Sequence, residues 1–117
     1  MTTDQRLNII TEALDNSKAT EIQSLAVEHL TDMMDYIVVC TATSTTHAKS
    51  LARNLEIELK ANKIIILGIE GDNKSDWVLV DIGDIVAHIM LAETRELYAL
   101  EKLWDISTRK EAQTQNT

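Results

Sequence analysis

The apolar positions along the chain predict eight secondary-structure elements in the order α-β-β-α-β-β-β-α. The first is an amphipathic helix whose apolar face repeats at the helical period: Leu7, Ile10 and Leu14. Thr2 and Gln5 have the spacing of a capping box, which would start this helix. The Asn16-Ser17 pair weakens helix propensity, so we expect the helix to end there.

The second predicted helix carries the cleanest apolar stripe in the chain. Its members recur at helical spacing: Ala48, Leu51, Ala52, Leu55 and Leu59. The hydroxyl-rich run 43–46 offers several N-caps before it. Asn62 follows the stripe and can close the helix in a left-handed conformation.

Five segments have the composition of strands. Residues 19–27 alternate imperfectly, whereas residues 36–40 are β-branched and aromatic and suit a strand buried on both faces. The other three predicted strands cover residues 64–69, 77–82 and 85–90. Residues 72–75 have turn chemistry, and residues 92–104 are compatible with a closing helix. This order predicts an α/β (α+β) domain, a mixed five-stranded sheet flanked by helices.

The last two strands are predicted to form a tight hairpin. Gly83 and Asp84 would be its two-residue turn, which requires antiparallel strands. This turn fixes the register, so that Ile82 pairs with Ile85, Asp81 with Val86, and Leu79 with His88.

Length and composition bound the class of protein. The chain has 117 residues, enough for one domain, which we place at residues 1–106 with a mobile polar tail at 107–117. Its longest apolar run, residues 64–69, is far shorter than the roughly 20 residues of a membrane span. The N-terminal residues lack a signal-peptide pattern, and the single cysteine, Cys40, fits a reducing compartment. We therefore expect a cytoplasmic protein without a membrane segment.

The charge is unevenly distributed and narrows the choice of partner. The net charge is −8, and residues 70–105 carry nine acids against three bases. An acidic surface gains nothing from releasing counterions from a phosphate backbone, so direct nucleic-acid binding is disfavoured. A basic protein is the better electrostatic match, although acidity also serves solubility.

Asp81, Asp84 and His88 form the first candidate chemical site. Two carboxylates and an imidazole within eight residues could bind a metal or act as acid and base. The predicted hairpin places Asp84 in the turn and offsets Asp81 diagonally from His88, so only two ligands converge. A surface or interface role is favoured over catalysis.

Two further candidates have simpler structural explanations. His47 follows hydroxyls that could hold an anion at a helix N-terminus, but these hydroxyls are better explained as helix caps. Cys40 lies within an apolar strand and is expected to be a small buried hydrophobe rather than a nucleophile. The chain has neither a P-loop nor a Rossmann fingerprint, and we expect no cofactor.

The aromatic residues point to a binding surface. Residues 93–104 are either an ordinary closing helix or an interface segment, since Tyr, Trp and Arg dominate binding hot spots. The chain has no Phe, so Ile, Leu and Val must fill the core. Trp77, beside the turn, is therefore our candidate for a partly exposed contact residue.

Five segments, in this order and spacing, resemble the ribosomal silencing factor family (RsfS, or Iojap-like). They are Tyr-Ile-Val-Val at 36–39, Thr-Ser-Thr-Thr-His-Ala at 43–48, Glu-Gly at 70–71, Asp-Trp-Val-Leu-Val-Asp-Ile-Gly-Asp-Ile-Val-Ala-His at 76–88, and Glu-Thr-Arg-Glu-Leu-Tyr-Ala-Leu-Glu-Lys-Leu-Trp at 93–104. The resemblance covers about residues 4–105. It departs from the family pattern at residues 40–42 and 74–76.

The resemblance implies a regulator rather than an enzyme. It implies a nucleotidyltransferase-like fold without that fold's catalytic motif, binding to ribosomal protein L-fourteen on the large subunit, and a block on small-subunit association that represses translation under nutrient limitation. It also implies possible homodimers. The alternative is a small nucleotidyltransferase-like or metal-dependent enzyme that uses the first candidate site. We expect the partner-binding surface to include Trp77, Asp76, Asp81, His88, Glu70, Arg95, Tyr98, Glu101 and Trp104.

Overall fold

The computed structural model describes residues 1–71 and 76–99, and its elements follow the predicted order. They are α1 (Thr3–Asn16), β1 (Thr20–Ala26), β2 (Tyr36–Ala42), α2 (Thr45–Ala61), β3 (Gly68–Gly71), β4 (Trp77–Asp81), β5 (Ile85–Leu91) and α3 (Ala92–Tyr98). The strands form one sheet in the order β1-β2-β5-β4-β3. Only β2 and β5 pair in parallel, so the sheet is mixed, as predicted.

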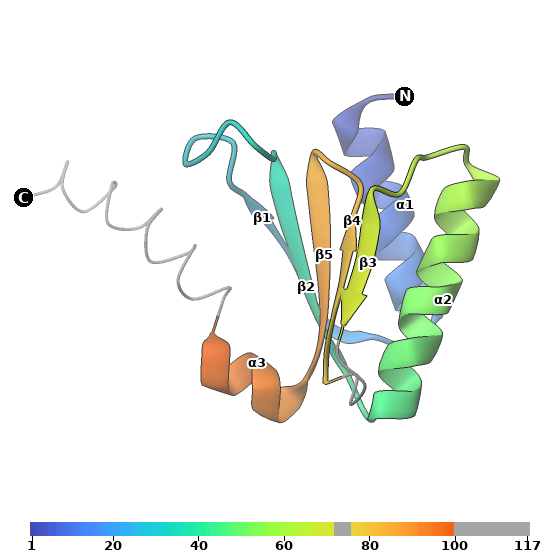
Figure 1. Cartoon of the computed structure of the whole chain (residues 1–117), viewed down its shortest axis with the longest axis vertical. Coiled ribbons are helices and arrows are strands. Elements are labelled where there is room, and N and C mark those ends of the chain that lie inside the picture. Colours follow the sequence, from blue (N-terminus) through green and yellow to red (C-terminus); the bar gives the residue numbers. More distant parts are fainter. Residues whose placement is uncertain (72–75, 100–117) are drawn as a thin grey trace, which may run out of the picture.

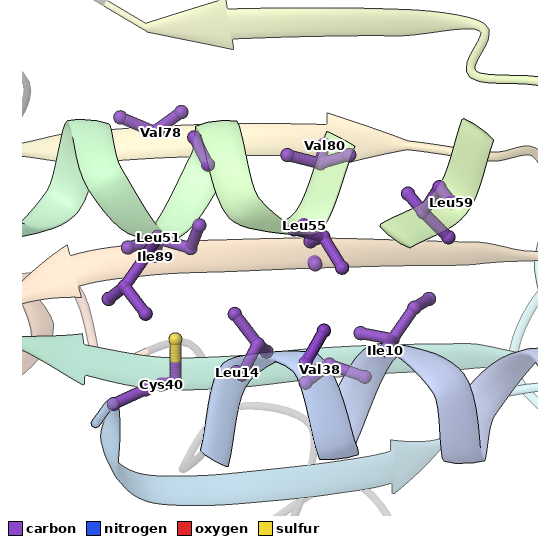
Figure 2. Packing of buried hydrophobic residues seen from close by; sticks show 14 of the residues in the cluster. Ile10, Leu14, Val38, Cys40, Leu51, Leu55, Leu59, Val78, Val80 and Ile89 are labelled. Atoms are coloured by element: carbon purple, nitrogen blue, oxygen red, sulfur yellow. The ribbon is translucent and has the colours of Figure 1, made fainter. Parts of the chain in front are cut away.

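Helices α1 and α2 cover one face of the sheet, while α3 lies on the other side at the end of β5 (Figure 1). All five members of the predicted α2 stripe are buried. Figure 2 shows Leu51, Leu55 and Leu59 of this stripe pointing into the layer between the helices and the sheet. On the sheet they face Val80 of β4 and Ile89 of β5, both buried in the same cluster. The main core therefore lies between the two long helices and the sheet.

The ends of the helices follow local side-chain chemistry. Thr2 and Gln5 form the predicted capping box at the start of α1, and the Ser44 hydroxyl caps α2 by accepting from a backbone N–H. The prediction that Asn62 turns left-handed is wrong, because its φ is −96° and the reversal falls on Lys63, at φ 60°. The Asn62 side chain instead donates to the Glu58 carbonyl (2.8 Å), which keeps this residue near the helical conformation.

The predicted strand 64–69 is misplaced at its start. The paired strand β3 begins only at Gly68 and ends at Gly71. The Ile64 N–H bonds back to the Leu59 carbonyl (2.9 Å), so this residue still belongs to the end of α2. Residues 65–67 return the chain to the sheet edge. The Leu67 N–H donates to the Asp81 carbonyl (2.8 Å), but the paired ladder begins at Gly68 because its partner Asp81 is the last residue of β4.

The β4–β5 hairpin has the predicted register. Asp81 pairs with Val86 and Leu79 pairs with His88, and the Ile82 N–H donates to the Ile85 carbonyl (3.0 Å) across the two-residue turn. Gly83 has φ 99°, a conformation that favours glycine. The predicted turn at 72–75 lies outside the described residues.

The closing helix is shorter in the described residues than the prediction. Helix α3 spans Ala92–Tyr98, and Ala99 follows it in a left-handed conformation. The remaining part of the prediction, including Glu101, Trp104 and the tail at 107–117, lies outside the described residues. Within the described ranges, no helix combines the length and apolar content needed to cross a membrane.

We predict that Leu55→Ala lowers the free energy of unfolding by about 2–5 kcal/mol, because it removes a fully buried side chain and leaves a cavity. Urea denaturation would measure the loss. Ile57→Ala on the same helix is the matched control, since Ile57 is exposed and should change stability by less than about 0.5 kcal/mol. Equal losses in the two variants would contradict the placement of the core.

Candidate functional site

The two faces of the sheet have different neighbours because side chains alternate along each strand. Along β5, Ile85, Ala87 and Ile89 pack into the core beneath α1 and α2. Val86, His88 and Met90 point to the opposite face. By the register of β3, β4 and β5, this face also carries Glu70, Trp77, Leu79 and Asp81. We call this surface, with Tyr98 of α3, the open face.

Trp77 is the centre of the open face. Its half-buried ring packs against a second apolar cluster, made of Val27, Ile37, Val39 and Met90. Its Nε1–H donates to Nδ1 of His88 (3.0 Å), and its ring centroid lies 4.8 Å from that of Tyr98, with the planes tilted by 49°. Tyr98 is 55% exposed. The predicted partial exposure of Trp77 is confirmed, and the ring continues into an exposed aromatic neighbour.

His88 is the hydrogen-bond acceptor that holds the Trp77 indole. The residue is only 8% exposed, and burial lowers its pKa from 6.5 to about 4. Its imidazole is therefore neutral at physiological pH, so Nδ1 can accept from Trp77 while the proton sits on Nε2. We predicted that His88 contacts a partner, but little of its side chain is exposed. The structure places His88 where its hydrogen bond orients Trp77.

Arg95 anchors α3 to the sheet. Its side chain is buried, and Nη1 donates to the Thr41 hydroxyl (2.9 Å) and to the Glu21 carbonyl (2.6 Å). The Glu21 carboxylate also lies 3.9 Å from Nη1. Because these groups belong to β1 and β2, Arg95 fixes the helix that brings Tyr98 to Trp77. This burial revises the expectation of a direct partner contact at Arg95.

Acidic groups lie along the open face near Trp77. Glu70, Trp77 and Leu79 line a shallow hollow of about 280 Å³ on the open face. Glu70 is exposed and Asp76 is partly exposed directly before Trp77. Asp81 lies at the turn end of β4, where its carboxylate accepts from the Gly83 N–H (2.8 Å). Carboxylates thus lie at both ends of the β4 segment that carries the indole.

The candidate acid–base site is not assembled. Asp84 forms an ion pair with Arg6 and accepts from the Thr3 hydroxyl (2.8 Å), both on α1. Burial acts to raise the pKa of Asp84, but the hydrogen bonds from Arg6 and Thr3 outweigh it and the pKa is lowered. Asp84 therefore stays ionised and holds α1 against the hairpin turn. It takes no part in the Trp77–His88 hydrogen bond. Among the described residues, no group of three or more His, Cys, Asp or Glu could hold a metal ion.

Cys40 and His47 have the structural roles that the sequence favoured. Burial raises the pKa of the Cys40 thiol to about 12, so it does not supply a thiolate. His47 Nδ1 accepts from the Thr43 N–H (2.9 Å), and Nε2 lies 2.9 Å from the Ser17 carbonyl. His47 thereby joins the end of α1 to the start of α2.

Sequence reasoning missed the residues that hold the aromatic pair in place. Thr41 and Glu21, which receive the Arg95 guanidinium, come from strands far from α3 in the chain. Nothing in their local sequence marks them. Leu79 could have been assigned to the candidate surface from the sequence alone, because the predicted hairpin register already placed it opposite His88.

These features define a small α+β domain that presents an aromatic, acid-flanked sheet face. The model of the family described as "Ribosomal silencing factor during starvation" matches residues 1–117, and the chain belongs to this family of regulators that act on the ribosome.

Individual relatives agree with this assignment. The chain is 38% identical over 98 residues to the ribosomal silencing factor RsfS of Haemophilus influenzae, covering 84% of this chain and 96% of that protein. It is 35% identical over 103 residues to the mouse protein named "Mitochondrial assembly of ribosomal large subunit protein 1", covering 86% of this chain and 45% of that one. A crystal structure of a protein from Chromobacterium violaceum superposes with a TM-score of 0.87 at 35% identity, covering 90% and 88% of the two chains.

We predict that acid destabilises the protein through His88. The unfolded residue titrates near pH 6.5 and the folded one near pH 4, so the unfolded state binds more protons between these values. Stability should fall as the pH drops through this window, by up to about 3 kcal/mol from this residue.

Urea denaturation at a series of pH values would measure this effect in the protein and in His88→Asn. The variant keeps an acceptor for the Trp77 indole but does not titrate in this range, so its stability should depend less steeply on pH. An unchanged slope in His88→Asn would show that another group causes the acid sensitivity.

Proposed function

We propose that the protein binds the large ribosomal subunit through ribosomal protein L-fourteen and blocks association with the small subunit, which represses translation when nutrients are limited. Membership of the silencing factor family supports the regulatory role. The name of the mouse relative, which refers to assembly of the ribosomal large subunit, favours that subunit as the target. We infer that this regulator acts in the cytoplasm and catalyses no reaction.

The observation that carries the proposal is the aromatic pair on the open face. The rings of Trp77 and Tyr98 lie 4.8 Å apart, and Tyr98 is largely exposed. Large, rigid aromatic groups lose little conformational entropy when they bind, and Trp and Tyr are enriched at the centres of interfaces. The hydrogen bond from the indole to His88 holds the ring before a partner arrives.

The flanking carboxylates suit a basic partner. Glu70 and Asp76 lie beside Trp77, and Asp81 lies on the same face at the other end of β4, in the part of the chain with the largest excess of acids. Complementary charges speed association and fix orientation more than they add affinity. We therefore assign the affinity to the aromatic pair and the orientation to these carboxylates.

We divide the predicted contact residues into two groups. Trp77, Tyr98 and the three carboxylates would touch the partner, whereas His88 and Arg95 would position Trp77 and α3. Glu101 and Trp104 remain predicted contacts. A homodimer formed through the open face would compete with the ribosome for the same residues.

The proposed function is tested by subunit joining. Added to separated ribosomal subunits, the protein should lower the yield of joined ribosomes in a sucrose gradient, because it would occupy the joining surface of the large subunit. Peptide-bond formation on preformed ribosomes should be unaffected. Unchanged joining at saturating protein, with the protein bound to the large subunit, would refute the block.

We predict that Tyr98→Ala and Trp77→Ala each weaken binding to large subunits. Removing an aromatic contact at the centre of an interface typically costs about 2 kcal/mol, roughly thirtyfold in affinity. Co-sedimentation with large subunits would measure the loss. Ile57→Ala is the control, since it removes an exposed apolar side chain from α2 on the opposite side of the sheet.

Tyr98→Ala separates binding from folding. Tyr98 is more exposed than Trp77, so its truncation should leave the melting temperature nearly unchanged while affinity falls. Trp77→Ala should also lower the melting temperature, because the ring covers Met90 and its neighbours. Normal binding by Tyr98→Ala and by Trp77→Ala would exclude the open face as the contact surface.

A further inference from the structure

Strand β3 leaves one edge of the sheet open. It is the last strand in the order β1-β2-β5-β4-β3 and pairs only with β4 among the described residues. The backbone groups on its outer side therefore have no strand partner in this part of the chain. Such an edge can accept another extended segment by main-chain hydrogen bonding.

Exposed apolar side chains lie in β3 and in the segment just before it. Ile65, Leu67 and Ile69 are 77%, 66% and 41% exposed, and Ile69 is the one of the three that belongs to β3. Ile69 pairs with Val80, whose side chain belongs to the helix-side core, so Ile69 lies on the helix side of the sheet. Isolated exposed apolar residues are common, so the case for a partner rests on Ile69, whose exposed side chain adjoins both the open edge and the groove described next.

A groove between α2 and β3 adjoins this edge on the helix side. It encloses about 380 Å³, and Lys49 and Arg53 of α2 and Ile69 of β3 are among its lining residues. Within residues 1–71 and 76–99, neither Lys49 nor Arg53 has an ion-pair or hydrogen-bond partner for its side chain. Two cations without partners in the described part of the chain distinguish this groove in a protein of net charge −8.

The acids of the groove do not cancel these cations. Glu56 is held by Lys60 of the next helical turn, with 3.0 Å between nitrogen and oxygen. Glu70 pairs with Leu79, which by alternation puts its side chain on the open face, so its backbone is the part that borders the groove. Among the described residues, positive charge is therefore left facing the groove.

We propose that this groove binds an extended acidic peptide segment of a second protein, which adds as a strand to the free edge of β3. The backbone of the segment would pair with residues 68–71, and its acidic side chains on the helix side would face Lys49 and Arg53. An apolar side chain between those acids would pack on Ile69. This site goes beyond the proposed ribosome contact, because it lies on the helix side of the sheet and the aromatic pair lies on the open face.

The probe for this site is a capped heptapeptide, Thr-Asp-Thr-Val-Thr-Asp-Thr, whose alternate positions place two acids and one valine on the same side. Titrated into the isotopically labelled full chain without ribosomes, it should give saturable amide shifts at residues 68–71 and around Lys49 and Arg53. The counterpart with Lys in place of Asp should bind more weakly. A version with N-methylated amides on the pairing side should lose binding, because it cannot form the ladder.

A pair of charge-reversal variants tests the role of the cations. Arg53→Glu should weaken the acidic peptide by about fivefold, as expected for the loss of a partly exposed ion pair. Lys18→Glu makes the same change in total charge at an exposed position outside the groove, and should leave the affinity unchanged.

Each other outcome would overturn the proposal. Equal affinity for acidic and basic peptides, or equal losses in the two variants, would exclude charge recognition by the groove. Full binding of the N-methylated peptide would exclude strand addition. Absence of saturable shifts, or shifts confined to Trp77 and Tyr98, would exclude the site, while the proposed ribosome contact is tested separately with large subunits.

Discussion

Strand β5 is covered on both faces, and the rest of the structure is arranged around this constraint. Ile85, Ala87 and Ile89 need cover on one side, while His88 and Met90 need it on the other. The long stripe of α2 supplies the first cover, and Trp77 with α3 supplies the second. A shift of the hairpin by one residue would turn Ile85, Ala87 and Ile89 to the open face and His88 toward the core, so the β4–β5 register carries much of the specificity of the fold.

The residues that cover β5 on the open face include polar groups, and each of these groups needs a hydrogen-bond partner. A buried polar group without a hydrogen bond costs about 1–3 kcal/mol, more if it is charged. His88 satisfies the indole of Trp77, and Thr41 with Glu21 satisfies Arg95. The same bonds that stabilise this layer also fix the directions of the two aromatic rings. Stability and recognition therefore rest on neighbouring residues.

The two sides of the sheet differ in charge as well as in shape. Acidic residues flank Trp77 and Tyr98 on the open face, while Lys49 and Arg53 on α2 face the groove beside β3. A single small sheet thus presents an aromatic surface suited to a basic partner and an edge suited to an acidic one. The two surfaces share residues of β3 and β4, but Lys49 and Arg53 belong to α2, so changes on α2 can test the groove without touching the aromatic pair.

The sequence by itself determined the elements and the hairpin register. Those depend on local chemistry: the capping box at Thr2, the helical stripe through Leu55, and the two-residue turn at Gly83. It also identified Trp77 as a half-exposed aromatic. It misplaced the start of β3, because the apolar run after Asn62 has the composition of a strand but reaches the last residue of β4, Asp81, only at its end. Only the tertiary structure decided that His88 and Arg95 support the aromatic pair, since the partners of Arg95 are distant in the chain and the burial of His88 is a property of the packed sheet.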